Sequence, residues 1–473
     1  MAVAVVLCAC GSSSIDVPDG ASTDASNSTD ASKADAAVSD AQHSDAAVSD
    51  ASTSPRVTKV VASVQRTCVL LDNGGVKCWG PNANGELGLG DTLERGATAG
   101  QMGDALPYVD LGTGRTAFTV MAGELHTCAV LDNSKAKCWG HNASGELGLG
   151  DTNARGDGPG QMGDALPTVE LGTGRTATEV GGGQYGSCAL LNAGAIKCWG
   201  INQYGQAGVG DSQRHGDGPG EMGDSLLSTD LGSGIATAMT VGFHTCALLN
   251  NGSVKCWGYG MHGQLGQGDK PFSRGNMPGQ IGNALPAIDF GTGRTAKAIA
   301  AGTEHTCVLL DNAKVKCWGY NNAGQLGLGD MFSRGDEPNE MGDKLPYVDL
   351  GTGRTATAIF AGRDHACAVL DNGKLKCWGS NGYGALGLGD TASRGDESGE
   401  MGDALPAIEL GTGRTASSVA MGTGHMCAVL DNGKLKCWGL NAIGQLGLGD
   451  KVQRGSKAGE MGDALPYVDL GTK

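Results

Sequence analysis

One motif recurs seven times along this chain and limits the folds open to it. The motif is a cysteine, nine residues and then Cys-Trp-Gly, and successive copies start 60, 60, 58, 61, 60 and 60 residues apart. The cysteine pairs are Cys68 with Cys78, Cys128 with Cys138, Cys188 with Cys198, Cys246 with Cys256, Cys307 with Cys317, Cys367 with Cys377 and Cys427 with Cys437. A sustained repeat of this length predicts a closed propeller or an open solenoid, in which each copy is one structural unit.

Each copy contains short apolar runs separated by turn residues. In the second copy the runs are 106–111, 116–121, 126–131 and 135–140, and such runs predict strands. Glycine contributes 83 of 473 residues, well over twice its usual share of about 7%, which disfavours helical packing. Four strands are the content of one propeller blade. We therefore expect an all-β, seven-bladed β-propeller of four-stranded blades over 57–473.

The phase of the repeat favours a ring over an open solenoid. The first hairpin, 66–80, has no Leu-Pro-x-Val-Asp-Leu-type strand before it, and the last such strand, 465–470, has no hairpin after it. The extra strand at the C-terminal end matches the strand that is missing before the first hairpin. We expect the C-terminal strand to join the first blade, so that the ring closes with no unpaired terminal strand.

The sequence of one copy resembles a known repeat. Residues 425–439, HMCAVLDNGKLKCWG, are followed by Asn441 and by GQLGLGD at 444–450. This stretch resembles the repeat of the regulator of chromosome condensation family, whose fold is a seven-bladed β-propeller, and the resemblance runs from residue 57 to the end. It implies guanine-nucleotide exchange on a GTPase as one activity. The paired cysteines, the leader and a longer loop per blade differ from nuclear members, so the function is argued from the site.

The spacing of the cysteines predicts one disulfide in each blade. A three-residue turn at 132–134 places Cys128 opposite Cys138, and directly opposed residues on antiparallel strands are close enough to be bridged. Seven pairs of buried reduced thiols are the alternative. Zinc is a third possibility, which the wide spacing disfavours. Disulfides indicate an exported protein.

The N-terminal region predicts an anchor and a tether. Residues 1–10, MAVAVVLCAC, resemble a partial lipoprotein-type signal with Cys10 as the lipidation site. Residues 11–56 hold eight aspartates and no aromatic residue, a composition that predicts a disordered tether. We expect an outer-membrane-anchored lipoprotein or an extracellular protein. The alternative is that this apolar N-terminal run has no targeting role.

Two further residue types recur in the hairpins. The same register places Trp139 opposite Thr127, so we expect seven equivalent indoles to fill the seams between blades. Five histidines share one position that faces a glycine, and we interpret them as buried packing residues that bond to the backbone. A metal-binding or channel-lining ring of imidazoles is the alternative. These histidines are His126, His244, His305, His365 and His425.

Each copy also contains an irregular loop of about fifteen residues, a length that favours function or disorder. The loops leave equivalent points, so we expect them to crown one face, which is the candidate binding surface. Its candidate residues are Asp91, Arg95, Asp151, Arg155, Asp211, Arg214, Asp269, Arg274, Asp330, Arg334, Asp390, Arg394, Asp450 and Arg454. An Asx turn with a local ion pair explains each Asp and Arg without a ligand. Calcium binding and, for three Arg-Gly-Asp triplets, adhesion are the alternatives.

The sequence favours recognition over catalysis. No catalytic triad, metal-ligand helix or phosphate loop stands out, and sevenfold sameness disfavours an active site, which needs an asymmetric set of groups. We predict a cell-surface or secreted recognition or scaffold module that binds protein or glycan, without cofactor or metal. A net charge of −16 disfavours nucleic acid, and we expect membrane contact only through the lipid anchor. The alternatives are a propeller-fold carbohydrate-active enzyme and a GTPase regulator.

Overall fold

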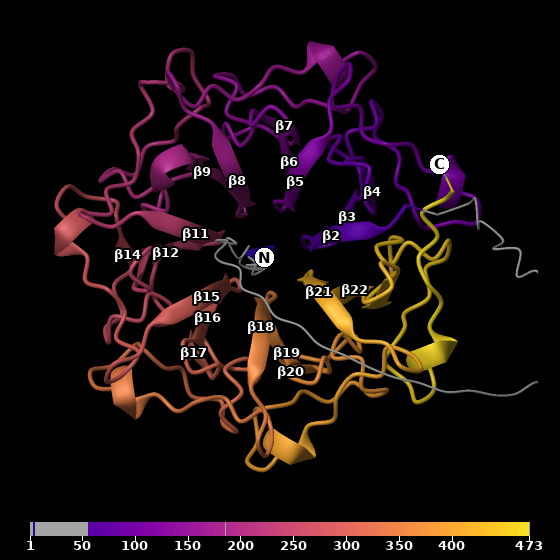
Figure 1. Cartoon of the computed structure of the whole chain (residues 1–473). Helices are drawn as coiled ribbons and strands as arrows, with labels where there is room; N and C mark the ends of the chain where they lie inside the picture. The colour runs from indigo at the N-terminus through magenta and orange to yellow at the C-terminus, as the bar shows by residue number, and fades with distance from the viewer. Residues whose placement is uncertain (1–2, 5–54, 185, 473) are drawn as a thin grey trace, which may run out of the picture. The chain divides into compact units, whose positions relative to one another are not determined.

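Seven β-sheets follow one another in chain order around a common centre (Figure 1). A computed structural model describes residues 3–4, 55–184 and 186–472. The first strand of each sheet lies nearest the centre. The predicted lipidation site Cys10 and the predicted tether up to residue 54 lie outside the described residues.

Each sheet is built on three antiparallel strands, and we number the sheets 1 to 7 in chain order. The strands are β2 (Val57–Ala62), β3 (Thr67–Leu71) and β4 (Val76–Trp79); β5 (Ala117–Ala122), β6 (His126–Leu131) and β7 (Ala136–Gly140); β8 (Ala177–Gly182), β9 (Gly186–Leu191) and β10 (Ile196–Gly200); β11 (Ala236–Val241), β12 (His244–Leu249) and β13 (Val254–Tyr259); β15 (Ala296–Ala301), β16 (His305–Leu310) and β17 (Val315–Gly319); β18 (Ala356–Ala361), β19 (His365–Leu370) and β20 (Leu375–Gly379); β21 (Ala416–Met421), β22 (His425–Leu430) and β23 (Leu435–Gly439). Two two-residue strands extend this pattern: β14 (Ser273–Arg274) pairs with β13, and β1 (Val3–Ala4) pairs with β15.

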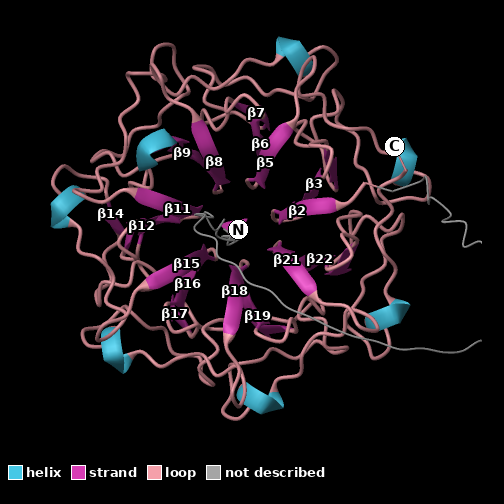
Figure 2. Cartoon of the chain, viewed as in Figure 1, coloured by secondary structure: helices cyan, strands magenta, loops and turns pink. Residues whose placement is uncertain are grey.

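Helical structure in the described ranges is confined to three-residue 3₁₀ turns (Figure 2). Six of them end long loops: η1 (Gly103–Ala105), η2 (Gly163–Ala165), η4 (Gly282–Ala284), η5 (Gly342–Lys344), η6 (Gly402–Ala404) and η7 (Gly462–Ala464). The remaining one, η3 (Asn192–Gly194), forms a hairpin turn. None of these turns has the length or apolar character to cross a bilayer.

The fourth strand predicted in each copy is wrong. The segment 106–111 is irregular, and it contacts sheet 1 through one backbone bond, from the Val109 N–H to the Val76 carbonyl at 2.8 Å. Its proline removes one of the donors that a strand needs. The long loop instead supplies the outer pairing, because Arg95 forms an isolated bridge with Gly80, and β14 is the two-residue version of this bridge in sheet 4.

The C-terminal segment 465–470 bonds to sheet 7, and its prediction as a strand of sheet 1 is wrong. The Val468 N–H donates to the Leu435 carbonyl of β23 at 2.9 Å, just as Val109 bonds to the hairpin that precedes it in the chain. The end of the segment then contacts sheet 1, where Lys77 Nζ donates to the Leu470 carbonyl at 2.7 Å. The first and last sheets therefore share a hydrogen-bonded seam, and β2 and β21 lie side by side (Figure 1).

The apolar core lies in the seams between neighbouring sheets. One cluster joins Cys68, Val76 and Leu87 of the first copy with Trp139 of the second. The Trp139 indole is fully buried, and its Nε1–H donates to the Glu86 carbonyl of the preceding copy at 3.1 Å. This confirms the prediction that the indoles fill the seams, where each also satisfies its polar nitrogen.

Every predicted cysteine pair is bonded in the structure, with one disulfide in each of the seven sheets. Cys128 stands opposite Cys138 in the β6–β7 ladder, with their Cα atoms 4.1 Å apart. The short turn at 132–134 sets this register, with Ser134 in the left-handed region at φ 61°. The bonded pairs are Cys68 with Cys78, Cys128 with Cys138, Cys188 with Cys198, Cys246 with Cys256, Cys307 with Cys317, Cys367 with Cys377 and Cys427 with Cys437. Each disulfide closes a loop of about 11 residues, which chain entropy values at about 2.8 kcal/mol.

Candidate functional site

Strand direction brings two kinds of connection to one face of the described sheets. The third strand of each sheet ends beside the turn that joins the first and second strands, and the His141 N–H, just after β7, donates to the Leu125 carbonyl at 2.9 Å. The long loops begin here. We call this surface the loop face; it comprises the seven long loops and the seven first turns.

The predicted Asp and Arg residues form local ion pairs within each loop. Arg155 Nη2 lies 2.7 Å from Asp151 Oδ2, and Asp151 Oδ1 accepts the Asn153 N–H at 2.9 Å, which is an Asx turn. In the third loop, His215 rather than Arg214 pairs with Asp211, at 3.2 Å. These residues hold the loops in shape. The other pairs are Asp91 with Arg95, Asp269 with Arg274, Asp330 with Arg334, Asp390 with Arg394 and Asp450 with Arg454.

The loop backbone is ordered by hydrogen bonds. Gln161 Oε1 accepts the N–H groups of Gly156 and Gly158 at 2.8 and 3.2 Å, and the Gly156 carbonyl accepts the Gly90 N–H of the preceding loop at 3.0 Å. The first two residues of the first Arg-Gly-Asp triplet are therefore engaged within the protein, because Arg155 is ion-paired and Gly156 is buried. This supports the interpretation that the triplet arose by sequence variation within a structural loop and not as an adhesion motif.

A second aspartate recurs near the end of each long loop except the fourth, and it accepts hydrogen bonds from the neighbouring copy. Asp164 accepts the Thr113 N–H at 2.9 Å and the Thr113 hydroxyl at 2.5 Å. These two hydrogen bonds hold the pKa of the Asp164 carboxyl below its usual value. The described residues contain no group of three or more His, Cys, Asp or Glu side chains placed to hold a metal ion.

The recurrent histidines pack in the seams, each in a different one. His126 faces Gly140 in the ladder, as expected, but its Nε2 bonds to a side chain, the Ser187 hydroxyl of the next sheet, at 2.7 Å. Burial lowers the pKa of His126 to about 3, so the imidazole is neutral at physiological pH. The sequence led us to expect a backbone partner for the His126 ring, and the Ser187 hydroxyl takes that place.

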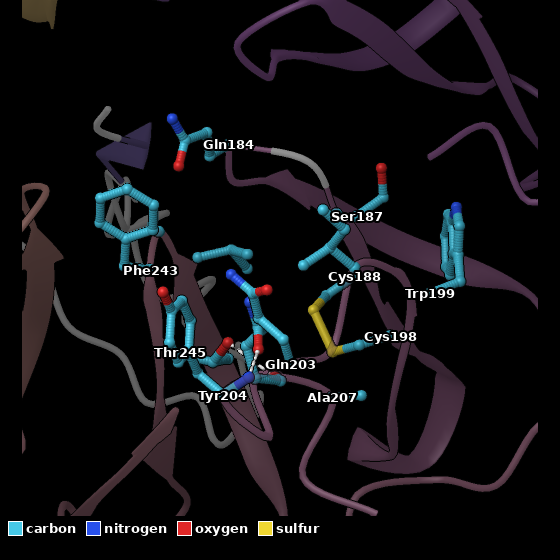
Figure 3. Close-up of a pocket in the computed structure, with 15 residues that line it drawn as sticks. Gln184, Ser187, Cys188, Cys198, Trp199, Gln203, Tyr204, Ala207, Phe243 and Thr245 are labelled. Atoms are coloured by element: carbon cyan, nitrogen blue, oxygen red, sulfur yellow. Dashed lines mark hydrogen bonds between the residues drawn. A yellow bond between two sulfur atoms is a disulfide. The ribbon is translucent and has the colours of Figure 1, made fainter. Parts of the chain in front are cut away.

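The repeat breaks at the seam between sheets 3 and 4. Gly186 stands where five sheets have histidine, and a cavity of about 200 Å³ lies against it (Figure 3). Tyr204, Phe243 and Thr245 also line this cavity. The Cys188–Cys198 disulfide lines it as well. We call this space the sheet 3–4 cavity.

Aromatic side chains gather beside the sheet 3–4 cavity on the loop face. The ring centroids of Tyr204 and Tyr259 are 5.0 Å apart, and those of Tyr204 and Phe272 are 5.5 Å apart. The chain has only 14 Phe and Tyr residues, so five in one cluster is a strong local concentration. The rings come from three successive copies and form what we call the aromatic cluster: Tyr204, Phe243, Tyr259, His262, Phe272 and Tyr320.

Seven residues of six types meet where the first turns converge. One from each sheet lines a second cavity of about 90 Å³: Val64, Glu124, Gln184, Phe243, Thr303, Arg363 and Thr423. Gln184 and Phe243 line both cavities, so the two adjoin. Burial raises the pKa of Glu124, and burial likewise raises the pKa of Asp364, next to Arg363 in the chain.

The asymmetric site differs from the residues that the sequence singled out. Its signals were the glycine at 186, the shortened spacing of 58 residues between Cys188 and Cys246, and the aromatic residues between 204 and 272. Each departure is small within a single repeat. Only the fold brings them together across three sheets.

Two models described as Regulator of chromosome condensation (RCC1) repeat match this chain. One matches residues 57–86, 120–146, 296–325, 356–385 and 416–445, and the other matches 251–309 and 372–429. The segments of the first model fall on the Cys-Trp-Gly hairpins and the turns that follow them, whereas the two segments of the second model also span a long loop each.

Relatives with similar sequences agree with these matches. The chain is 26% identical over 408 residues to the Ultraviolet-B receptor UVR8 of Arabidopsis thaliana, covering 85% of this chain and 81% of that protein. It is 28% identical over 285 residues to Protein pim1 of Schizosaccharomyces pombe, covering 58% and 49%. It is also 26% identical to the E3 ubiquitin-protein ligase HERC2 of Homo sapiens, over 79% of this chain but 7% of that protein.

Solved structures show the same fold. A structure of Kap60 bound to yeast RCC1 (Prp20) matches with a TM-score of 0.59 and 19% identity, over 88% of this chain and 85% of the other. Human WBSCR16 matches with a TM-score of 0.57 and 18% identity, over 78% and 86%. The chain therefore carries regulator of chromosome condensation (RCC1) repeats and has an RCC1-like β-propeller fold.

Proposed function

We propose that this protein is an exported recognition module that binds a partner protein through its loop face, with the aromatic cluster at the centre of the contact. The observation that carries the proposal is the break in sevenfold sameness at sheets 3 to 5. In protein interfaces a few clustered side chains carry most of the binding energy, and here the cavity, the aromatic rings and the converging first turns adjoin.

Exposed apolar side chains at the loop tips favour a protein as the ligand. Phe272 of the aromatic cluster is 60% exposed, and Met331 and Phe332 in the next loop are 59% and 73% exposed. Aromatic and methionine side chains are enriched in protein–protein interfaces. The backbone bonds between loops hold these tips in place, which reduces the entropy lost on binding.

Charge supports a partner whose contact surface is basic around an apolar centre. Residues 57–473 contain 32 Lys and Arg against 42 Asp and Glu, a net charge of −10. Glu304 of the loop face lies 3.8 Å from His262 of the aromatic cluster. Opposite charges around an apolar contact speed association and exclude acidic competitors.

The proposal includes export, with Cys10 as a lipid anchor and residues 11–56 as a tether, and a ring of seven sheets. Seven disulfides support an oxidising compartment. The hydrogen-bonded seam between sheets 1 and 7 supports closure of the ring, which gives the loop face a rigid base.

The test is binding to intact cells with two matched variants. Phe272→Ser changes an exposed ring of the aromatic cluster, and Phe118→Ser changes an equally exposed ring at the start of β5, away from the loop face. We expect Phe272→Ser to weaken binding at least about tenfold, as for a central interface residue, and Phe118→Ser to leave it unchanged. Equal effects of both variants, capture of a glycan on an array, or hydrolysis of a sugar or peptide would each overturn the proposal.

A further inference from the structure

Three seams contain the same contact between an imidazole and a hydroxyl, which serves as an internal standard. His126 Nε2 lies 2.7 Å from Ser187 Oγ, His244 Nε2 lies 2.7 Å from Thr306 Oγ1, and His425 Nε2 lies 3.0 Å from Thr67 Oγ1. In each case the histidine comes from one sheet and the hydroxyl from the next. All of these side chains are buried.

The direction of these hydrogen bonds is fixed by a second contact of each hydroxyl. Ser187 Oγ donates to the Glu146 carbonyl at 2.9 Å, and Thr306 Oγ1 donates to the Gln264 carbonyl at 3.0 Å. Because a hydroxyl has one proton, its oxygen must accept from the ring, so the imidazole donates Nε2–H. The buried Nδ1 atoms of His126 and His425 have no partner in the described structure, which agrees with a neutral ring that carries its proton on Nε2.

The seam between sheets 3 and 4 has the hydroxyl but not the imidazole. Thr245 Oγ1 donates to the Gln206 carbonyl at 3.0 Å, so its proton is committed as in the other seams, and no side chain or N–H of the described residues donates to its oxygen. Thr245 is buried and lines the sheet 3–4 cavity, where Gly186 contributes no side chain.

The other exception in the repeat shows that a missing histidine need not leave a space. Sheet 1 has Arg66 at the equivalent position, and its Nη2 donates to the carbonyls of Gly123 and His126 at 3.0 and 2.7 Å. The arginine therefore fills the seam between sheets 1 and 2. In the described structure, the seam between sheets 3 and 4 keeps the cavity instead.

We propose that the sheet 3–4 cavity binds a planar N–H heteroaromatic ring, whose N–H donates to Thr245 Oγ1 in the place that an imidazole occupies in the sister seams. The described lining residues are uncharged, so the bound ring is neutral. Tyr204 and Phe243 line the cavity with aromatic rings, and Gln184 lines it with an amide (Figure 3). This deepens the proposed function and rests on it only in that the ligand arrives at the loop face.

The first test uses two small probes on the wild-type protein, at a pH above their ring pKa. 4-Methylimidazole has an N–H group, and 1-methylimidazole has the same size but none. We expect 4-methylimidazole to bind at least about tenfold more tightly by calorimetry, the ratio that corresponds to one buried hydrogen bond. Equal affinities, or no binding of 4-methylimidazole, would overturn the inference.

Matched variants locate the probe. Thr245→Val removes the acceptor and should lower the affinity for 4-methylimidazole about tenfold, whereas Thr306→Val, in a seam already filled by His244, should leave it unchanged. Gly186→His supplies an internal imidazole and should abolish binding. Full affinity in Gly186→His or in Thr245→Val would place the probe elsewhere and contradict the inference.

A third arm identifies the source of the ring and separates this inference from the proposed function. A short peptide with one histidine is compared with the same peptide carrying alanine. Competition by the histidine peptide alone assigns the cavity to a partner's histidine side chain, and competition by neither peptide, with 4-methylimidazole bound, assigns it to a free heterocycle. Loss of probe binding in the presence of Phe272-dependent cell binding would overturn this inference and leave the proposed function standing.

Discussion

Thr472 bonds to Asp104 across 368 residues of chain. Its N–H donates to Asp104 Oδ1 at 2.8 Å, and its hydroxyl donates to Oδ2 at 3.1 Å. The last copy therefore meets the first through a contact that also joins five other pairs of neighbouring copies. The same pair of bonds joins neighbouring copies elsewhere: Thr113 with Asp164, Thr173 with Asp224, Thr292 with Asp343, Thr352 with Asp403 and Thr412 with Asp463.

Removal of residues 465–473 should destabilise the whole propeller. Leu465, Val468 and Leu470 are buried, and the last two pack in one cluster with Trp79 and Val57 of sheet 1. Loss of these three side chains should lower the free energy of unfolding by at least about 5 kcal/mol. Urea unfolding of the truncated and parental proteins measures this decrease. Deletion of Lys473 alone is the control, and a truncated protein with the parental midpoint and elution volume would contradict the closed seam.

The register of the hairpins could be predicted from sequence because it depends on local geometry. Side chains alternate with a period of two along a strand, so the three-residue turn at 132–134 is sufficient to place Cys128 opposite Cys138 and Trp139 opposite Thr127. The same holds for His126 opposite Gly140. No long-range information was needed.

The segment 106–111 could not be predicted in the same way. It alternates like a strand, but its carbonyls are taken by other groups: the Leu111 carbonyl accepts from Lys137 Nζ at 3.0 Å, and the Asp110 carbonyl from the Gly163 N–H at 3.1 Å. The lysine before the second cysteine recurs in all seven copies, yet its role depends on tertiary contacts. The sheet 3–4 cavity is a similar case, because Gly186 alone does not reveal whether its neighbours fill the space.

The Cys188–Cys198 disulfide should be the first to be reduced in the native protein. Thiol exchange requires access to a sulfur, and these two cysteines line the sheet 3–4 cavity with 2% and 3% exposure. Brief treatment with a small reductant, followed by alkylation and mass spectrometry, should label this pair before the other six. Gly186→His should slow its reduction by filling the cavity. Simultaneous labelling of all seven pairs would contradict the accessibility argument.

Opposite substitutions in two seams should change stability in opposite directions. His244→Gly opens a cavity beside Thr306 and should lower the free energy of unfolding by about 2–4 kcal/mol. Gly186→His fills the sheet 3–4 cavity, although its Cβ would lie 3.1 Å from the Trp199 carbonyl oxygen and require a small shift. We therefore expect the free energy of unfolding to rise by about 1 kcal/mol, as for other cavity-filling substitutions. Denaturant titration of both variants measures the changes. A destabilised Gly186→His protein would show that the cavity does not accept an imidazole.

Stability should fall between pH 6.5 and pH 3 because of the buried histidines. Burial lowers the pKa of His305 to about 3, whereas the unfolded chain has its histidine pKa near 6.5. In this window the unfolded state binds more protons, so the free energy of unfolding rises with pH and is fully present above the unfolded pKa. At pH 5 each such histidine should lower the free energy of unfolding by about 2 kcal/mol relative to pH 7.5.

The variant His305→Phe tests this expectation. It loses no ring hydrogen bond, since both ring nitrogens of His305 lack a partner in the described structure, and it should reduce the difference between the urea midpoints at pH 7.5 and pH 5. An unchanged difference between the two midpoints in His305→Phe would contradict burial as the cause.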